Sequence, residues 1–325
     1  MNIKMNLLRS NKLIFSSWFR GLRVPITYFD IGARGDIQEP WLQFQSDEIK
    51  VIGFEPDLFE CERLSKIYTN RRYYPYALWG NREIRPFYIC KWGSTSSMYP
   101  PSQDENKAYE PHHWSGRVPV KILQVECNKL DSIVPDVDSP DFIKIDTQGS
   151  EFEILKGAED LLISGNPLVL AETWCTDIYK GMPLTHDVMA LMYRLGYNVY
   201  DLSIAAAWRH SNTKITSCYC RQKTIGFDLL FVKRLDQISF SNGWNILKFA
   251  GLLELYGFRD YAIAVLERFQ YLNSHELANF QDALIHKAIT IMLSNDRVER
   301  SFRSRILRLS RKLIGKKGSL WPKLH

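Results

Sequence analysis

The sequence YFDIGARG at residues 28–35, followed by VIGFEPD at residues 51–57, decides the fold. Each stretch is a short run of β-branched and aromatic residues typical of a strand, and each ends in glycine or a carboxylate. Glycines at a strand end let the backbone approach a ligand closely. Glu55 stands 23 residues after Gly32, near the ~20-residue spacing at which an acid binds a ribose diol. The pair predicts a site for an adenosine-bearing cofactor.

Two cofactor classes compete for this site. A nicotinamide dinucleotide needs G-x-G-x-x-G, with its pyrophosphate at a helix N-terminus. Here the loop has only Gly32 and Gly35, and the acidic Asp36 that follows would repel a diphosphate. S-adenosylmethionine is cationic at sulfur and carries no phosphate, so acidic residues near the loop are compatible with it. The residues therefore favour S-adenosylmethionine.

Short apolar runs alternate with helical stretches from Thr27 to about Arg234, as in βαβ units on a parallel sheet. We expect strands at residues 28–31, 51–54, 74–77, 142–145, 168–171, 197–200 and 227–232. No convincing helix separates the last two, so these strands can pair antiparallel.

Helix signals fall between the strands and beyond them. Asp57 is placed to cap a helix over residues 58–68, and Ser150 with Glu153 fits a capping box. Beyond Gly243 the strand signal ends, and residues 244–272 and 277–293 have the apolar spacing of amphipathic helices. We expect a basic segment at 1–26, a catalytic-sized domain at 27–238 and a helical extension with a basic tail at 239–325.

The charge of the chain is unevenly distributed. The net charge is +6, yet residues 24–240 carry −6 between ends of +5 and +7. An acidic body is not the pattern of a nucleic-acid groove, so we expect no nucleic-acid partner. No apolar run reaches the ~18 residues of a membrane span, and no signal peptide is evident, which predicts a cytoplasmic protein.

The basic C-terminal residues 297–317 fit an amphipathic helix with one apolar stripe. We favour packing of that stripe on the protein itself. The alternative is peripheral contact with an anionic membrane surface at the inner face. The oligomeric state has no signal in the sequence.

A third motif, DFIKIDTQGSE at residues 141–151, places polar residues at the end of a central strand. Ligands of open α/β sheets bind at such strand ends, which makes Asp146 and Gln148 candidate catalytic residues. Lys144 lies two residues before Asp146 and therefore on the same face. A lysine in a buried strand needs a carboxylate partner, and Asp146 and Glu172 are candidates. A structural ion pair is favoured over direct catalysis by Lys144.

These motifs together resemble a known family. DIGARG, GFEPD, GSTSSM (93–98), KLDS (129–132), DFIKIDTQGSEFEILKGAEDLL (141–162) and AET keep the order found in FkbM-type S-adenosylmethionine-dependent methyltransferases. The D-T-Q-G segment and GMPL at 181–184 are similar to one branch of that family, and the resemblance covers residues 27 to about 234. It implies an α/β class I methyltransferase fold, Rossmann-like, with a seven-stranded sheet of order 3-2-1-4-5-7-6, the last strand antiparallel, and a C-terminal α-helical extension.

The resemblance also implies residue roles. Asp30 and the loop through Gly35 would contact the methionine end of the cofactor, Glu55 would bind the ribose, and Asp146 with Gln148 would lie beside the methyl group. The full set of expected cofactor contacts is Asp30, Gly32, Ala33, Arg34, Gly35, Glu55, Pro56, Asp57, Ala77 and Asp146. One position departs from the family: Asp36 stands where glycine is usual, which predicts a shifted loop or a lowered cofactor affinity.

Members of the family mostly methylate hydroxyl groups, so the resemblance implies O-methylation of a hydroxylated small molecule or a glycan. A general base assists such a reaction. The expected catalytic residues are Asp146, Gln148, Lys144, Glu172 and His113. His112 and His113 stand in a polar loop that either covers the site or is simply solvated.

Three further questions stay open at this point. Glu172 is as compatible with binding acceptor hydroxyls as with pairing to Lys144. Asp146, Glu172 and a histidine could hold a metal, but no ligand spacing requires one, so we expect none. Because of Asp36, the alternative function is a catalytically silent methyltransferase fold used as an interaction module. A nicotinamide oxidoreductase ranks third.

Overall fold

The computed structural model describes residues 24–136, 138–211, 221–269 and 283–293. Residues 23–241 form one compact unit, and the described residues from Asn242 onward belong to a second unit. The predicted basic segment 1–26 lies almost entirely outside the described residues, and the predicted amphipathic tail 297–317 lies wholly outside them. Within the described parts of the chain, no helix is both long and apolar enough to cross a bilayer.

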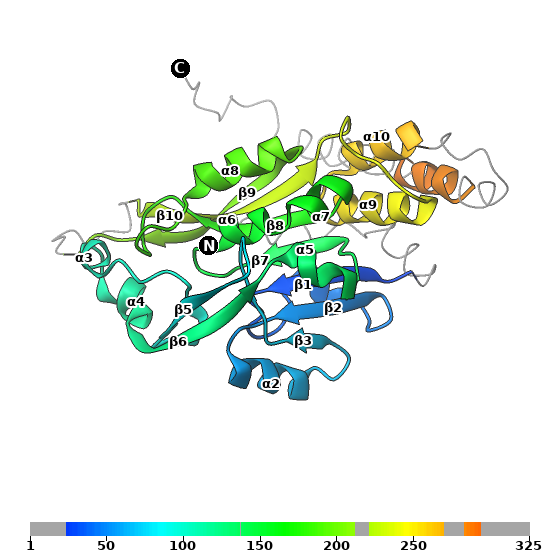
Figure 1. Cartoon of the computed structure of the whole chain (residues 1–325). Helices are drawn as coiled ribbons and strands as arrows, with labels where there is room; N and C mark the ends of the chain where they lie inside the picture. Colours follow the sequence, from blue (N-terminus) through cyan, green and yellow to red (C-terminus); the bar gives the residue numbers. More distant parts are fainter. Residues whose placement is uncertain (1–23, 137, 212–220, 270–282, 294–325) are drawn as a thin grey trace, which may run out of the picture. The chain divides into compact units, whose positions relative to one another are not determined.

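A seven-stranded sheet forms the centre of the first unit (Figure 1). Its strands are β1 (Ile26–Ile31), β2 (Ile49–Phe54), β3 (Arg72–Tyr74), β7 (Phe142–Ile145), β8 (Leu168–Trp174), β9 (Tyr197–Trp208) and β10 (Lys223–Lys233). Their order is β3-β2-β1-β7-β8-β10-β9, and β10 runs antiparallel to both of its neighbours. If only the strands of this sheet are numbered along the chain, from 1 to 7, their spatial order is 3-2-1-4-5-7-6, and the last strand is antiparallel. The predicted class I methyltransferase fold is confirmed.

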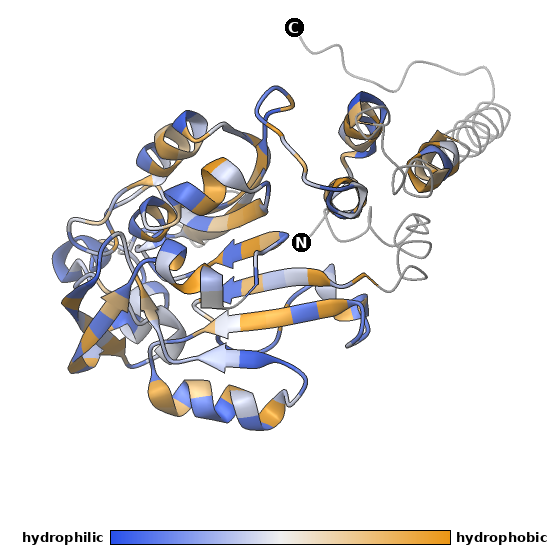
Figure 2. Ribbon diagram, turned by 45° about the vertical axis from the view of Figure 1, so that its right-hand side comes forward, coloured by the Kyte–Doolittle hydropathy of each residue, from blue (hydrophilic) through white to orange (hydrophobic). Residues whose placement is uncertain are grey.

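Four helices bury the main core against one face of this sheet: α5 (Leu130–Ile133), α6 (Glu151–Lys156), α7 (Glu159–Ser164) and α8 (Thr185–Arg194). Alternate strand residues such as Ile143, Ile145 and Val169 point into this layer, as the two-residue period of a strand requires. Figure 2 shows hydrophobic residues running along the strands. Polar residues at the strand ends are thereby left to the rim of the sheet.

The helix after β2 is α2 (Leu58–Ile67). The Asp57 carboxylate accepts a hydrogen bond from Phe59 N at 3.2 Å, so the predicted N-cap is confirmed. The next strand was predicted at 74–77, but β3 is Arg72–Tyr74 and ends before Pro75. Proline has no N–H to donate to a ladder, so the strand stops there, and Ala77 belongs to a different sheet.

A second, three-stranded sheet of order β4-β6-β5 was not predicted. Its strands are β4 (Ala77–Leu78), β5 (Glu83–Cys90) and β6 (Pro119–Asn128). Between β5 and β6 lie η3 (Gly93–Thr95), α3 (Gln103–Asn106), α4 (Pro111–Trp114) and η4 (Ser115–Arg117); the remaining 3₁₀ turns are η2 (Trp41–Gln43) and η5 (Val134–Asp136). This sheet matters for function because it contributes side chains to the cavity described below.

The second unit is helical where it is described. α9 (Gly243–Leu255) and α10 (Arg259–Phe269) cover most of the stretch expected to be helical at 244–272, and residues 283–293 are also helical. The Asn242 side chain accepts a hydrogen bond from Asn245 N at 3.0 Å and so begins α9. Gly257, with φ of +91°, makes the turn that separates the two helices.

Candidate active site

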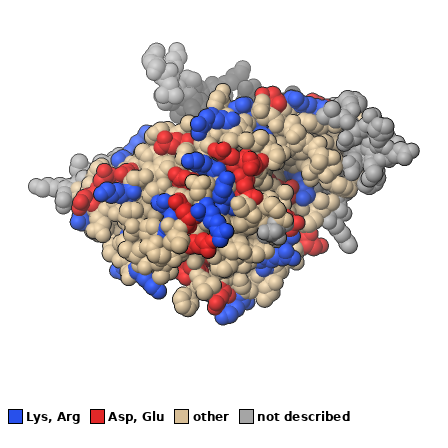
Figure 3. All heavy atoms as spheres, in the orientation of Figure 1, with Lys and Arg blue, Asp and Glu red and all other residues tan. Residues whose placement is uncertain are grey.

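A cavity of about 230 Å³ lies where β1, β2 and β7 end. Seven of the expected cofactor contacts line it: Asp30, Gly32, Arg34, Glu55, Pro56, Ala77 and Asp146. Three expected catalytic residues line it as well, namely Lys144, Asp146 and Gln148. The predicted residues that do not line it are Ala33, Gly35, Asp57, Glu172 and His113. On the face shown in Figure 3, Lys and Arg side chains lie beside Asp and Glu side chains.

Gly32 sets the shape of the first wall. Its φ is +80°, and a Cβ placed on it would lie 2.1 Å from the carbonyl oxygen of Asp146. Only glycine allows this loop and the end of β7 to approach so closely. Asp30, at the end of β1, is 5% exposed, and its Oδ1 is buried without a hydrogen-bond partner.

Glu55 follows β2 and is only 4% exposed. Its Oε1 accepts a hydrogen bond from Asp57 N at 2.8 Å, and an Arg34 nitrogen lies 3.9 Å away from the same oxygen. Burial raises the pKa of Glu55 to about 7, although Arg34 and the backbone N–H act to lower it. Near neutral pH this carboxyl group is therefore poised between its two protonation states.

An apolar slot lies beside Glu55 and Ala77. Its side chains come from β4, β5, the GSTSSM segment and α6: Leu78, Phe87, Met98 and Ile154. Sequence reasoning assigned no role to these four residues. Met98 belongs to the GSTSSM motif and Ile154 to the motif at 141–162, but neither motif by itself indicates an apolar slot.

Lys144 connects two carboxylates across the floor of the cavity. Its Nζ lies 3.3 Å from Asp146 Oδ2 and 3.6 Å from Asp30 Oδ1, and Asp30 is its register partner on β1. The predicted ion pair of Lys144 with Asp146 is confirmed. Burial acts to lower the pKa of Lys144, but the two carboxylates outweigh it and raise that pKa.

Gln148 ties the end of β7 to β8. Its Nε2 donates to Glu172 Oε2 at 2.6 Å and to Asp146 Oδ1 at 3.1 Å. Its Oε1 accepts from Tyr179 Oη at 3.1 Å and from Arg117 Nη2 at 3.4 Å. Arginine only donates, so this contact fixes which way the amide points. Among the described residues, Gln148 is the one non-glycine with a positive φ, at 58°.

The two carboxyl groups that Gln148 joins have opposite protonation tendencies. Burial and the Asp146 carboxylate raise the pKa of Glu172 well above its usual range. Burial also acts to raise the pKa of Asp146, but Lys144 and a hydrogen bond from Glu172 bring it below its usual value. Asp146 is therefore the ionised member, and Glu172 holds the proton. The Asp146 side chain remains 34% exposed.

Glu151 organises the D-T-Q-G loop in place of the predicted capping box. Its carboxylate accepts hydrogen bonds from Thr147 N at 2.9 Å and Gly149 N at 3.0 Å. Ser150 precedes α6 but makes no side-chain cap, so the capping-box prediction was wrong. A longer acidic side chain one residue later takes the free N–H groups of this turn.

His112 and His113 lie on α4 and not in a loop, and neither lines the cavity. His113 Nε2 accepts a hydrogen bond from Arg209 N at 3.1 Å, and its ring stacks on Trp208 with centroids 5.7 Å apart. The prediction of a polar loop carrying His113 was wrong, because Pro111 begins a helical turn there.

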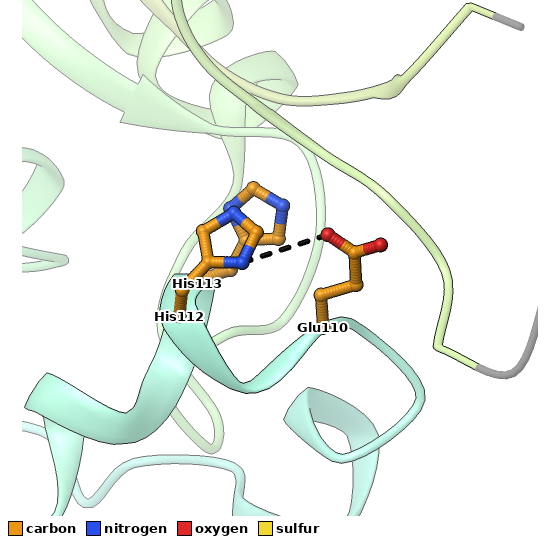
Figure 4. Close-up of side chains that lie close together, drawn as sticks. All are labelled: Glu110, His112 and His113. Atoms are coloured by element: carbon orange, nitrogen blue, oxygen red, sulfur yellow. Dashed lines mark ion pairs between the residues drawn. The ribbon is translucent and has the colours of Figure 1, made fainter. Parts of the chain in front are cut away.

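Figure 4 shows that Glu110, His112 and His113 come together, with His112 Nδ1 3.5 Å from Glu110 Oε2. Their potential ligand atoms all lie within 4.8 Å of one another. However, one His113 nitrogen already accepts a backbone hydrogen bond, and the Arg209 guanidinium lies 3.9 Å from Glu110. A neighbouring cation opposes metal binding, so we assign no metal to this cluster.

Asp36, the departure from the family pattern, pairs with a cation. Its Oδ1 lies 2.7 Å from an Arg71 nitrogen, and its side chain is 45% exposed. The loop still contains its positive-φ glycine at Gly35. The negative charge at the rim of the cavity is thus largely compensated.

The sequence of residues 30–199 matches the model of the methyltransferase FkbM domain, which is more than half of the chain. The chain belongs to the FkbM methyltransferase family. It is therefore an S-adenosylmethionine-dependent methyltransferase. A comparison with curated proteins finds no match.

Solved structures similar to this FkbM-family chain are distant. An FkbM methyltransferase from Methylobacillus flagellatus is 17% identical over 66% of this chain, with a TM-score of 0.35, and the match covers 47% of that protein's length. A TehB-like methyltransferase from Corynebacterium glutamicum is 10% identical, covering 70% and 91% of the two chains, with a TM-score of 0.31. A methyltransferase from Geobacter sulfurreducens, solved with S-adenosylhomocysteine, is 10% identical over 85% and 82%, with a TM-score of 0.29.

The cavity of this chain has the chemistry that S-adenosylmethionine requires. A buried carboxylate, Glu55, stands beside an apolar slot, and the buried Asp30 Oδ1, 3.6 Å from Lys144 Nζ, makes no close hydrogen bond. The carboxylates of the lining outnumber its two cations, Arg34 and Lys144. A positively charged nucleoside without phosphate groups fits this arrangement.

Proposed function

We propose that this FkbM methyltransferase methylates a hydroxyl oxygen of a glycan or another hydroxylated small molecule. The observation that carries the proposal is an ionised carboxylate, Asp146, exposed to the cavity and held ionised by Lys144. An alcohol must lose its proton as its oxygen is methylated, so it benefits from a carboxylate within hydrogen-bond reach. Family members mostly act on hydroxyl groups, which supports the same acceptor class.

In this proposal the cavity binds the cofactor through groups at its two ends. The Glu55 carboxylate accepts hydrogen bonds from the ribose hydroxyls, and the slot of Leu78, Phe87 and Met98 packs on the adenine. Asp30 faces the positively charged end of the ligand. Asp57 acts indirectly, because its backbone N–H orients Glu55.

S-adenosylmethionine supplies an electrophilic methyl group on a sulfonium. The chain itself supplies position and a proton acceptor. Asp146 hydrogen-bonds the acceptor hydroxyl and takes its proton, Lys144 keeps Asp146 ionised, and the doubly anchored Gln148 fixes the carboxylate's orientation. Holding donor and acceptor in line accounts for most of the rate gain in such displacements.

The cofactor site is tested by titrating S-adenosylhomocysteine into the purified chain in a calorimeter. We expect wild-type protein to bind and Glu55→Ala to lose about 100-fold in affinity, because two hydrogen bonds to a charged group are lost. Glu60→Ala is the matched control, because Glu60 lies on α2 and pairs with Arg63 at 2.6 Å. Wild-type protein that does not bind, or Glu55→Ala that binds like wild type, contradicts the proposed site.

The acceptor class is tested by incubating the chain with methyl-labelled S-adenosylmethionine and two panels, one of hydroxylated glycans and one of amines. We expect label in methyl ethers and a ~100-fold lower rate in Asp146→Asn, whose amide cannot accept the proton as a base. Label confined to the amines contradicts O-methylation.

The cytoplasm is the location that we propose for this activity. The composition of the chain supports it, because a protein of 325 residues with six cysteines does not need disulfides. No observation favours the silent interaction module, since a cavity stands at the expected cofactor site and Asp36 is paired with Arg71.

A further inference from the structure

A row of polar side chains crosses four neighbouring strands next to the cavity. Glu172 on β8 is the register partner of Asp228 on β10, and Asp228 is the partner of Ser203 on β9. Ile145 and Ala171 are register partners, and Asp146 and Glu172 are the residues that directly follow them, so Asp146 and Glu172 are also level. We call Asp146, Glu172 and Asp228 the carboxyl row.

The spacing of a sheet brings these carboxyl groups close together. Adjacent strands are about 4.8 Å apart, and like charges directly opposite one another are destabilising. The titratable side chains that face Glu172 come from several elements: Lys144 on β7 and Asp146 directly after it, Asp228 on β10, Glu151 at the start of α6, and Tyr179 after β8. Lys144 also pairs with Asp30, so one cation is shared among several acids. The row is therefore most stable when it holds a proton.

The row extends from the cavity to the edge of the sheet. Asp146 is at the cavity, Gln148 bonds both Asp146 and Glu172, and Ser203 Oγ lies 3.5 Å from Asp228 Oδ2 on β9, the last strand of the sheet. Glu172, Asp228 and Ser203 are all half-buried. A proton on Glu172 thus has a neighbouring acceptor on the solvent side of the row.

We propose that the carboxyl row stores one proton on Glu172 in the free enzyme and releases it through Asp228 when a sulfonium charge occupies the cavity, so that Glu172 can share the hydroxyl proton with the already ionised Asp146 only when the methyl donor is bound. The inference rests on the proposed transfer to a hydroxyl group. Asp228 acts through Glu172 and touches neither substrate nor cofactor, so it is a positioning residue. The physical cause is Coulombic, since a positive charge beside Asp146 favours ionised carboxyl groups.

In this scheme the protons released and taken up during the reaction are balanced. When the cationic ligand binds, one proton leaves Glu172 through Asp228 to water. In the transfer an O–C bond forms, the C–S bond breaks with its electron pair staying on sulfur, and the hydroxyl proton passes to Asp146 and is shared with Glu172. Sulfur is then neutral and the row again holds one proton, so the proton released at binding is the proton that methylation of an alcohol must release.

Two ligands that differ by one methyl group and one charge test the proposal. S-adenosylmethionine and S-adenosylhomocysteine are titrated into full-length protein near neutral pH, in two buffers of different ionisation enthalpy, to count the protons released. Any proton from Glu55 is released with both ligands, because both carry the ribose. We expect S-adenosylmethionine to release more, by up to about one proton.

Two variants test whether the carboxyl row causes the difference in proton release between the two ligands. Glu172→Gln has no carboxyl proton and should abolish the difference between the two ligands. Asp228→Asn removes the negative charge opposite Glu172, so Glu172 ionises more readily and the difference should move to lower pH. Asp201→Asn is the matched control, because Asp201 lies on the same face of β9 but opposite Leu230. Carbon NMR titration of the free protein should show the same fall in the Glu172 pKa in Asp228→Asn, which also verifies that the variant is folded.

The possible outcomes distinguish the inference about proton storage from the proposed methyltransferase function. Tight binding of both ligands with equal proton release overturns the inference and leaves the cofactor site standing. Retention of the difference in Glu172→Gln, or a Glu172 titration unchanged in Asp228→Asn, overturns it as well. Failure of both ligands to bind contradicts the proposed function, and the inference fails with it.

Discussion

Glu55 and Glu172 lie in two parts of one active site, and the charges of their neighbours differ. Glu55 is 4% exposed and Glu172 is half-buried, and burial is the largest cause of the raised pKa of both, to about 7 for Glu55 and well above the usual range for Glu172. At the β2 end, the neighbours of the carboxylate are Arg34 and a backbone N–H. In β8, the neighbours are the carboxyl groups of Asp146 and Asp228. Burial raises the pKa of both acids, while the neighbouring groups act in opposite directions, so Glu55 is poised to bind as an ion and Glu172 to store a proton.

The largest effect should come from substituting Gly32. This residue lies where the loop after β1 packs against the end of β7, and the same loop adjoins Glu55. Gly32→Ala would place a Cβ 2.1 Å from the Asp146 carbonyl oxygen at a φ of +80°. We expect a loss of about 4 kcal/mol in the free energy of unfolding, from overpacking together with backbone strain. Urea unfolding measures the loss, and calorimetry should show that S-adenosylhomocysteine binding is lost too.

Gly35→Ala is the matched control for that change. Gly35 has a φ of +87°, but a Cβ there would meet nothing within 4 Å. We expect about 1 kcal/mol, the strain of the left-handed backbone alone. Equal losses of unfolding free energy in the two variants would show that the contact of residue 32 with Asp146 does not hold the loop after β1 and the end of β7 together.

Most of the seven-stranded sheet could be predicted because its signals are local. Buried parallel strands are rich in apolar residues; Phe142–Ile145 is apolar at every position but Lys144, and its bounds agree with the prediction. The second sheet was missed for a physical reason. Pro86 interrupts the apolar pattern of β5, which is read as evidence against a strand, but β5 is an edge strand where a missing N–H costs little.

The candidate site could be predicted where one residue type at a strand end is enough. Glu55, Asp146 and Lys144 belong to that class and line the cavity. Arg117 and Tyr179, which orient Gln148, were missed because their contacts span 31 residues in the sequence. Asp228 carried a signal that was overlooked: it is a charged residue inside the apolar strand FDLLFV.

A pH series sharpens the contrast between the two glutamates. Ribose hydroxyl groups donate to the ionised form of Glu55, so binding favours ionisation and releases a proton. Because the pKa of Glu55 is about 7, the affinity for S-adenosylhomocysteine should rise as the pH increases from about 6 to 8, by about tenfold, and then level off. Calorimetric titrations at several pH values measure this slope.

Glu55→Gln is the control for the pH series. Its amide does not titrate, so the affinity should be lower and independent of pH over the same range. Glu172 should not make this affinity depend on pH, because S-adenosylhomocysteine brings no sulfonium charge to the carboxyl row. An affinity that falls with rising pH would show that Glu55 binds its ligand in the protonated form.

The smallest effect should come from Asp36, although this acid replaces the usual glycine at the rim of the cavity. Its carboxylate is 45% exposed and pairs with Arg71 at 2.7 Å. The Asp36 side of this pair is open to solvent although Arg71 is 12% exposed, so the pair contributes about 1 kcal/mol or less and is screened by salt, and Asp36→Asn should change the affinity for S-adenosylhomocysteine by less than about threefold. Titrations at low and high salt measure this change, and any difference should shrink at high salt. A change above tenfold that persists at high salt would mean that Asp36 contacts the ligand, and the electrostatics of the Glu55 end would then include a second carboxylate.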